Sequence, residues 1–297
     1  MEASGKRVMI VGVMRGFEVL FDYGEDSWAP NPAMAPYGKL GFPAAVAGRP
    51  WVFANFVQTL DGIVSLLGNE AGGADIAEAA EDRWLMDLLR AHADAVLLGM
   101  GTLREEQRLG RPRARGPVFR IVDAELQQLR AKLGRGRERN VLLTARADFQ
   151  LRDYAVFDGE LVDVTVVTTQ EGAARLEVQR GNHSWVDIVA VDGDEGGGVD
   201  LRKAVTALEE RYGIRYLLCE GGPALYSGMI KAGLIDEQFV TVSPMEVGRL
   251  SVYGPRPTML PEVGFSKEEA VRWQWLSCRK VADYQFHRFR RKSKGIC

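Results

Sequence analysis

The chain has 297 residues, of which 46% are hydrophobic and 26% charged, a composition typical of a folded globular protein. Its 38 basic and 40 acidic side chains nearly balance, so no net field would recruit nucleic acid or an anionic membrane surface. The three cysteines, Cys219, Cys278 and Cys297, are far apart and odd in number, which excludes a disulfide framework and favours a reducing compartment.

Residues 1–48 are rich in proline and glycine, especially from 28 to 45, and show weak hydrophobic periodicity. This pattern predicts an irregular N-terminal arm, followed by a single domain over residues 49–297. The aromatic residues of the arm indicate packing against the body or against a second subunit. The apolar run 8–14 is short and lacks a cleavage pattern, and no run elsewhere approaches the ~20 apolar residues of a membrane span. We therefore expect a cytoplasmic protein without membrane contact.

Strand and helix patterns alternate after the arm. The run WVFANFVQ (51–58) predicts a buried strand that ends at the turn TLDG. Apolar residues at three- and four-residue spacing predict a helix over 76–92, and DAVLL (94–98) predicts the next strand. Shorter strands are expected at 118–122, 140–144 and 162–168.

The second half of the chain begins with a glycine-rich loop, 192–200, which ends at Asp200, a favourable helix N-cap. A helix over 201–212, a strand over 215–219 and a short helix over 226–232 follow. The remaining strands are expected at 236–244, 270–276 and 281–289. This order predicts an α/β fold of three layers, α/β/α, around a mixed, mostly parallel sheet with antiparallel C-terminal strands. His92, His183 and His287 are isolated from one another, so no metal site is predicted.

Two predicted strands end in glycine-bearing turns, LLGMGT (97–102) and LLCEGGPAL (217–225). Ligands bind beyond the carboxyl ends of strands in open α/β sheets, and glycine there lets backbone N–H groups approach a phosphate. Together the two turns would hold one dinucleotide. The alternative is that these glycines only permit tight turns, since neither segment is a GxGxxG fingerprint.

The order of four motifs carries the interpretation further: TLDG (59–62), RAHADAVLLGMGTLR (90–104), CEGGPAL (219–225) and GLIDEQFVTVSP (233–244). Over residues 49–290 the chain resembles the riboflavin-biosynthesis pyrimidine reductases, which comprise the reductase domain of bifunctional deaminase-reductases and its stand-alone relatives. The resemblance implies a dihydrofolate-reductase-like fold, NADPH as cofactor, a pyrimidine ribotide as substrate and a homodimer. The His-x-Glu and Pro-Cys-x-x-Cys pattern of the deaminase zinc site is missing from the sequence.

Residue roles follow from the resemblance. In that family the two glycine-bearing turns hold the cofactor diphosphate, and a strand-end threonine is a weaker candidate for its adenosine part. The cofactor-binding residues implied here are Gly99, Gly101, Thr102, Leu103, Thr168, Gly221, Gly222, Pro223, Ala224 and Leu225.

The acidic residues of the LDG and EGG motifs face the substrate in such reductases. Asp61 and Glu220 are therefore the implied catalytic and substrate-binding residues, with Asn55 and Thr59 beside them in the pocket. Asp61 before Gly62 is also compatible with a simple turn, and Asn55 and Thr59 with hydrogen bonds inside the sheet. Glu220 after an apolar strand is harder to explain as a solvated charge.

The implied reaction is hydride transfer from the nicotinamide to C1′ of the ribosylamino group, opened to its imine, in 5-amino-6-ribosylaminouracil 5′-phosphate. Where many relatives carry Asp-Asp-Pro after the first glycine turn, this chain has Glu105 and Glu106. Two alternatives remain open at this point. One is a related reductase for a pterin or another carbonyl or imine, and the other is a non-catalytic nucleotide binder.

Overall fold

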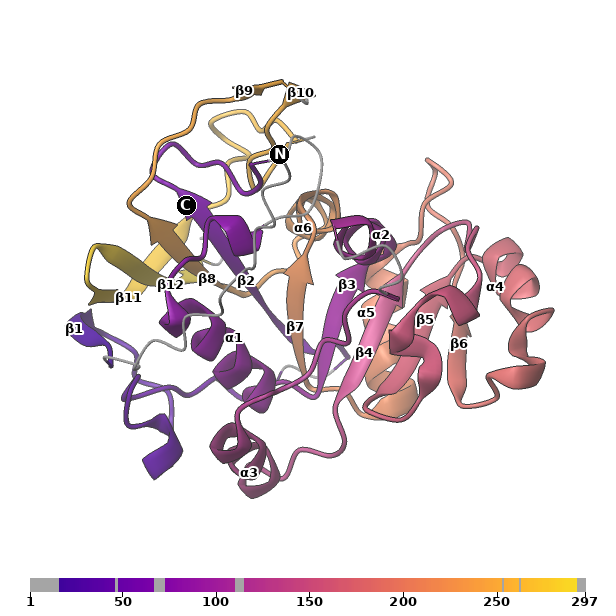
Figure 1. Cartoon of the computed structure of the whole chain (residues 1–297), viewed down its shortest axis with the longest axis horizontal. Coiled ribbons are helices and arrows are strands. Elements are labelled where there is room, and N and C mark those ends of the chain that lie inside the picture. The colour runs from indigo at the N-terminus through magenta and orange to yellow at the C-terminus, as the bar shows by residue number, and fades with distance from the viewer. Residues whose placement is uncertain are drawn as a thin grey trace, which may run out of the picture.

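The computed structural model describes residues 16–45, 48–66, 73–109, 115–252, 254–261 and 263–292. A ten-stranded sheet runs through it in the order β1-β11-β12-β8-β2-β7-β3-β4-β5-β6 (Figure 1). A separate two-stranded ribbon pairs β9 (Leu250–Ser251) with β10 (Gly254–Pro255).

The strands from β8 to β6 in the sheet order all run parallel to their neighbours. Their side chains are largely apolar on both faces, because helices cover both sides of a parallel sheet. These strands are β2 (Trp51–Thr59), β3 (Ala95–Gly99), β4 (Arg139–Leu143), β5 (Asp163–Thr168), β6 (Val186–Ala190), β7 (Tyr216–Gly221) and β8 (Glu237–Ser243).

The other side of the sheet is antiparallel. β12 (Tyr284–Arg291) pairs with β8, β11 (Trp273–Val281) pairs with β12, and β1 (Glu18–Asp22) forms the edge. The predicted mixed sheet with antiparallel C-terminal strands is therefore confirmed.

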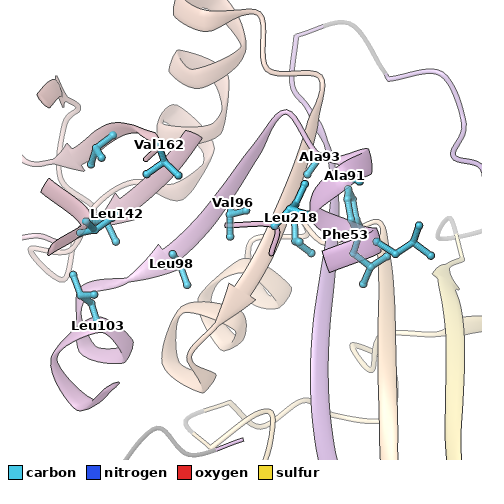
Figure 2. Close-up of a cluster of buried hydrophobic side chains, with 14 of the residues drawn as sticks. Phe53, Ala91, Ala93, Val96, Leu98, Leu103, Leu142, Val162 and Leu218 are labelled. Carbon is cyan, nitrogen blue, oxygen red and sulfur yellow. The ribbon is translucent and has the colours of Figure 1, made fainter. Parts of the chain in front are cut away.

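Helices lie on both faces and form two cores. On one face α1 (Ala80–His92), α2 (Met100–Leu109), α3 (Ala124–Lys132) and α4 (Gln170–Glu177) contribute side chains to the same cluster as Val96 and Leu98 of β3. On the other, α5 (Leu201–Tyr212) and α6 (Pro223–Lys231) pack with Ala95 and Leu97. The alternation along β3 is the two-residue period of a strand, and it confirms the three predicted layers. Figure 2 shows part of the first core, where Val96 and Leu98 lie near Leu218.

The N-terminal segment differs from the irregular arm that the sequence predicts. Within it, Glu18–Asp22 forms β1 and pairs with β11, and Pro32–Met34 forms a short 3-10 helix, η1. Met34, Tyr37 and Leu40 are buried in the first core. The proline- and glycine-rich composition hid these elements, because they draw their stability from contacts with the body rather than from local periodicity.

Most predicted strands are present within a few residues, but the one expected at 118–122 is not. There the backbone bonds to side chains instead of a neighbouring strand. Asn140 bonds the Phe119 N–H at 3.1 Å and the Phe119 carbonyl at 2.7 Å, and Glu138 accepts from the Ile121 N–H at 2.8 Å.

Other elements were not predicted. Helices α2, α3 and α4 and strand β6 lie where the sequence offered only turns and polar connections. The helix expected over 76–92 begins only at Ala80, and the helix expected from 226 begins earlier, at Pro223. The Asp200 cap is confirmed, since its side chain accepts from the N–H groups of Arg202 and Lys203. Short 3-10 turns fill the remaining connections at Gly73–Asp75, Leu151–Asp153, Ala155–Asp158 and Arg180–Asn182.

Candidate active site

The two glycine-bearing turns meet at the carboxyl ends of the neighbouring strands β3 and β7. A Cβ atom on Gly222 would lie 2.8 Å from the Thr102 hydroxyl oxygen, and one on Gly99 would lie 3.7 Å from the Leu225 Cβ. The first distance is too short for a Cβ without a shift of Thr102, whereas the second is an ordinary van der Waals contact. The sequence expectation that the turns converge is therefore met.

A cavity of about 310 Å³ opens beside these turns. Its wall combines the end of β2, the inner face of α1, the extended segment 117–119 and the starts of α2 and α6. Residues singled out from the sequence that line it are Asn55, Thr102, Glu220, Gly222 and Pro223. The cavity thus joins the expected substrate residues of β2 and β7 to the expected cofactor turns.

Glu220 lines the cavity with an ion pair already in place. Its carboxylate accepts from Arg90 Nε and Nη2 at 2.7 Å each, and the two side chains are 5% and 3% exposed. Arg90 also donates to Asp87 at 3.2 Å and to the Arg120 carbonyl at 2.9 Å. Arg90 was not identified from the sequence, because on α1 it resembles any polar residue next to an apolar stripe.

Asp82, also on α1, is a second cavity residue that sequence reasoning missed. Its side chain is buried, and within the described part of the chain its Oδ1 has no hydrogen-bond partner. Burial raises the pKa of this carboxyl to about 6, because desolvation disfavours the charged form. Asn55 Oδ1 is likewise buried and unpaired among the described residues. The cavity therefore presents two acceptor oxygens that are not used inside the protein.

Asp61 lies outside the cavity lining and is exposed. Its carboxylate accepts from the Thr59 hydroxyl at 2.5 Å and from the Gly248 N–H at 2.6 Å, which ties the end of β2 to the loop after β8. These bonds lower its pKa, the Thr59 hydroxyl most of all. Thr59 is buried and also accepts from the Ile63 N–H at 2.9 Å. Both residues bond around the turn that follows β2, and neither is among the residues that line the cavity. The catalytic and binding roles expected of them stay predictions.

The other expected cofactor residues divide into two groups. Gly101 and Ala224 are exposed in the first turns of α2 and α6, which begin at the carboxyl ends of β3 and β7. Leu103, in contrast, is fully buried in the core (Figure 2). Thr168 lies two strands beyond β3 and donates to the Ala145 carbonyl at 3.3 Å. The side chains of Glu105 and Glu106 lie outside the described residues.

The profile of the RibD C-terminal domain family matches residues 50–284. The chain belongs to this family. Among curated relatives, a 2,5-diamino-6-ribosylamino-4(3H)-pyrimidinone 5′-phosphate reductase of Archaeoglobus fulgidus is 31% identical over 205 residues, 67% of this chain and 83% of the relative. The riboflavin biosynthesis protein RibD of Aquifex aeolicus is 26% identical over 204 residues, 67% of this chain and 48% of that protein. The resemblance to pyrimidine reductases inferred from the sequence is confirmed.

Two solved structures share the fold. A pyrimidine reductase-like protein of Corynebacterium diphtheriae superposes with a TM-score of 0.61 at 21% identity, covering 82% of this chain and 93% of that one. Acinetobacter baumannii RibD gives a TM-score of 0.59 at 18% identity, covering 83% of this chain and 59% of that one.

The local structure fits the dinucleotide that the RibD C-terminal domain family implies. α6 starts at Pro223 with Gly222 as N-cap and no side-chain cap, so its first N–H groups are not bonded by a capping side chain. Such amides bind phosphate oxygens without a basic side chain. Within the described ranges, no group of three or more His, Cys, Asp or Glu side chains is placed to hold a metal. None of the described helices is long and apolar enough to cross a bilayer.

Proposed function

We propose that this protein reduces the ribosyl group of a ribosylaminopyrimidine 5′-phosphate to the ribityl form in riboflavin biosynthesis, with NADPH as hydride source. The observation that carries the proposal is the cavity at the meeting point of the two glycine turns, with Asn55, Asp82 and Glu220 in its wall. Membership of the reductase family supports the reaction class.

The polarity of the cavity supports a pyrimidine ligand. An aminopyrimidine carries several N–H donors, and the unpaired oxygens of Asn55 and Asp82 are acceptors that such donors would satisfy. A buried acceptor left unpaired costs about 1–3 kcal/mol. Ligands that supply N–H groups therefore gain more here than ligands that carry only carbonyl oxygens.

The cofactor would be held by backbone amides at the starts of α2 and α6, together with the Thr102 hydroxyl. Bound there, it supplies the hydride. The chain's own contribution is to orient the ribosylamino carbon, exclude water and deliver one proton to the substrate. Arg90 fixes Glu220 in one position, so the cavity wall is organised before the substrate arrives.

The decisive experiment is turnover by the purified protein. NADPH is mixed in parallel with 5-amino-6-ribosylaminouracil 5′-phosphate, with its 2,5-diamino-pyrimidinone counterpart and with dihydrofolate. Loss of NADPH absorbance and a product two hydrogens heavier by mass spectrometry are expected with at least one ribotide. Turnover of dihydrofolate alone would make the protein a pterin reductase. NADPH binding without reduction of any substrate would make it a nucleotide binder.

A paired substrate series sharpens the assignment. The diamino-pyrimidinone carries an amino group where the aminouracil carries a carbonyl. Because the cavity offers unpaired acceptors, we expect the diamino form to have the lower KM, and Asn55→Leu to raise KM for both. NADH in place of NADPH under the same conditions tests the cofactor preference.

We further propose a cytoplasmic homodimer. Cys219 and Cys278 are both free thiols, as expected in a reducing compartment. The apolar segment 234–244 is largely buried in its own subunit, because its residues 237–243 form β8 inside the sheet, so it is a poor candidate for the dimer contact. The aromatic side chains Tyr23 and Trp275, 67% and 47% exposed at the β1 edge, are better placed for the contact. Light scattering after gel filtration measures the oligomeric state, and a monomer would exclude the dimer.

A further inference from the structure

The Asp82 carboxyl occupies an unusual position on α1. It is 6% exposed, lines the cavity, and leaves Oδ1 without a partner in the part of the chain that the structure describes. Buried carboxyls normally satisfy both oxygens by hydrogen bonds or an ion pair. Asp82 therefore places a carboxyl group with one unpartnered oxygen in the wall of a ligand-sized cavity.

The charged groups among the described cavity residues are Asp82, Arg83, Arg90 and Glu220. A group that gives up a proton in a reaction must first carry one. Glu220 is unsuited to this, because both its oxygens already accept hydrogen bonds from the Arg90 guanidinium, so neither is free to donate to a ligand. A guanidinium group does not give up a proton in proteins, so neither arginine serves as the donor. Asp82 is left as the cavity group able to exchange a proton.

The surroundings of Asp82 favour the protonated form up to about pH 6. Burial raises its pKa to about 6, and the positive charge of Arg83, on the same helix, opposes this only in part. The Thr241 hydroxyl of β8 lies nearby and also lowers the pKa, although its Oγ1 does not reach hydrogen-bonding geometry with any described group. A carboxylic acid with a pKa close to the working pH is suited to general acid catalysis.

We propose that Asp82 is the proton donor of the reduction, an inference that rests on the proposed function. As C1′ of the open-chain imine accepts the hydride that the reduced nicotinamide supplies, the C=N electron pair moves to nitrogen. That nitrogen takes the proton from the Asp82 carboxylic acid. The products are the ribitylamino compound, the oxidised nicotinamide and the Asp82 carboxylate, which regains its proton from water after product release.

The first test compares Asp82→Asn with wild type under single-turnover conditions. Asparagine keeps the shape and cannot donate the proton, so the rate is expected to fall about 10²–10⁴-fold. The wild-type rate should decline as the pH rises above about 6, and the rate of the variant should not show this decline. Glu78→Gln is the matched control, because Glu78 is exposed just before α1 and should leave both rate and profile unchanged.

The second test needs no turnover. Infrared spectra of the protein alone should contain a protonated-carboxyl band that titrates near pH 6 and disappears in Asp82→Asn but not in Glu78→Gln. The proposal is overturned if Asp82→Asn turns over within about threefold of wild type or keeps the alkaline limb. It is also overturned if no such band is present. A wild-type protein that reduces neither ribotide would instead refute the proposed function, which separates the two failures.

Discussion

Both carboxylate oxygens of Glu220 accept hydrogen bonds from the guanidinium of Arg90, at 2.7 Å each. The two residues lie 130 positions apart in the chain and join the last turn of α1 to the end of β7. The bidentate geometry fixes the direction of both side chains at once. Because this pair also forms part of the cavity wall, the same contact stabilises the fold and shapes the site.

Removing one partner should therefore be costly. Glu220→Ala leaves the Arg90 charge buried, with Asp87 as the described carboxylate that still bonds it, and a broken buried pair costs about 3–5 kcal/mol. The urea midpoint is expected to fall accordingly. Asp148→Ala is the control, because its pair with Arg104 is exposed and contributes little. Equal midpoints for the two variants would show that the Glu220 pair is not a stabilising contact.

The contact between the two glycine turns can be tested by a double-mutant cycle. Gly222→Ala places a Cβ 2.8 Å from the Thr102 hydroxyl oxygen, so about 1–3 kcal/mol of stability and part of the NADPH affinity should be lost. Thr102→Ala removes the oxygen that clashes. The double variant should then recover most of the stability, measured by urea unfolding. Strictly additive effects would contradict direct contact between the turns.

Asp61 allows its role as a loop anchor to be separated from a role in catalysis. Its pKa is lowered from 3.8, so the stability it contributes is present above pH 3.8 and is lost as the pH falls through the lower folded-state value. Asp61→Asn should accordingly reduce the melting temperature at neutral pH and have little effect in strong acid.

The same variant tests catalysis. The resemblance to the family implies a large fall in turnover, whereas the position of Asp61 outside the cavity implies a modest one that follows the displaced loop. Measuring kcat and KM with either ribotide decides between them. A fall in kcat of more than about a hundredfold with an unchanged melting temperature would assign Asp61 to the chemistry.

The sequence is sufficient to predict the sheet and the two converging glycine turns, but not the residues that form the cavity wall. Strands β2, β3 and β7 are short apolar runs followed by glycine-bearing turns, so a short stretch of sequence is enough to predict them. The segment 118–122 has the same local pattern and is not a strand, because the Asn140 side chain takes the place of a partner strand. Local composition cannot show which groups form hydrogen bonds with the backbone N–H and C=O groups of a segment.

Asp82 and Arg90 illustrate the other limit. Both lie on a helix whose apolar stripe the sequence predicts, and neither belongs to that stripe. Their importance arises from burial against β7 and the cavity, which depends on contacts distant in sequence. Glu220 was recognisable because a charge directly after a buried strand is rare. An acidic or basic residue within one helical turn of an apolar stripe offers no comparable signal.

Two buried groups on α1 should oppose each other in the pH dependence of stability. Burial lowers the pKa of His92 from 6.5 to about 4, so the stability this residue contributes is present above pH 6.5 and is lost as the pH falls toward 4. The pKa of Asp82 is raised from 3.8 to about 6, so its contribution is present below 3.8 and is lost as the pH rises through 6.

Between about pH 4 and 6 each group changes the free energy of unfolding by about 1.4 kcal/mol per pH unit, with opposite sign. Wild-type stability in this window should therefore vary little. His92→Gln removes the contribution that is lost in acid, so the free energy of unfolding of this variant should increase toward low pH. Asp82→Asn removes the opposing contribution, so the free energy of unfolding of that variant should decrease toward low pH. Urea unfolding at half-unit intervals of pH measures all three slopes. Parallel profiles would mean that neither group titrates with the shifted pKa that its burial implies.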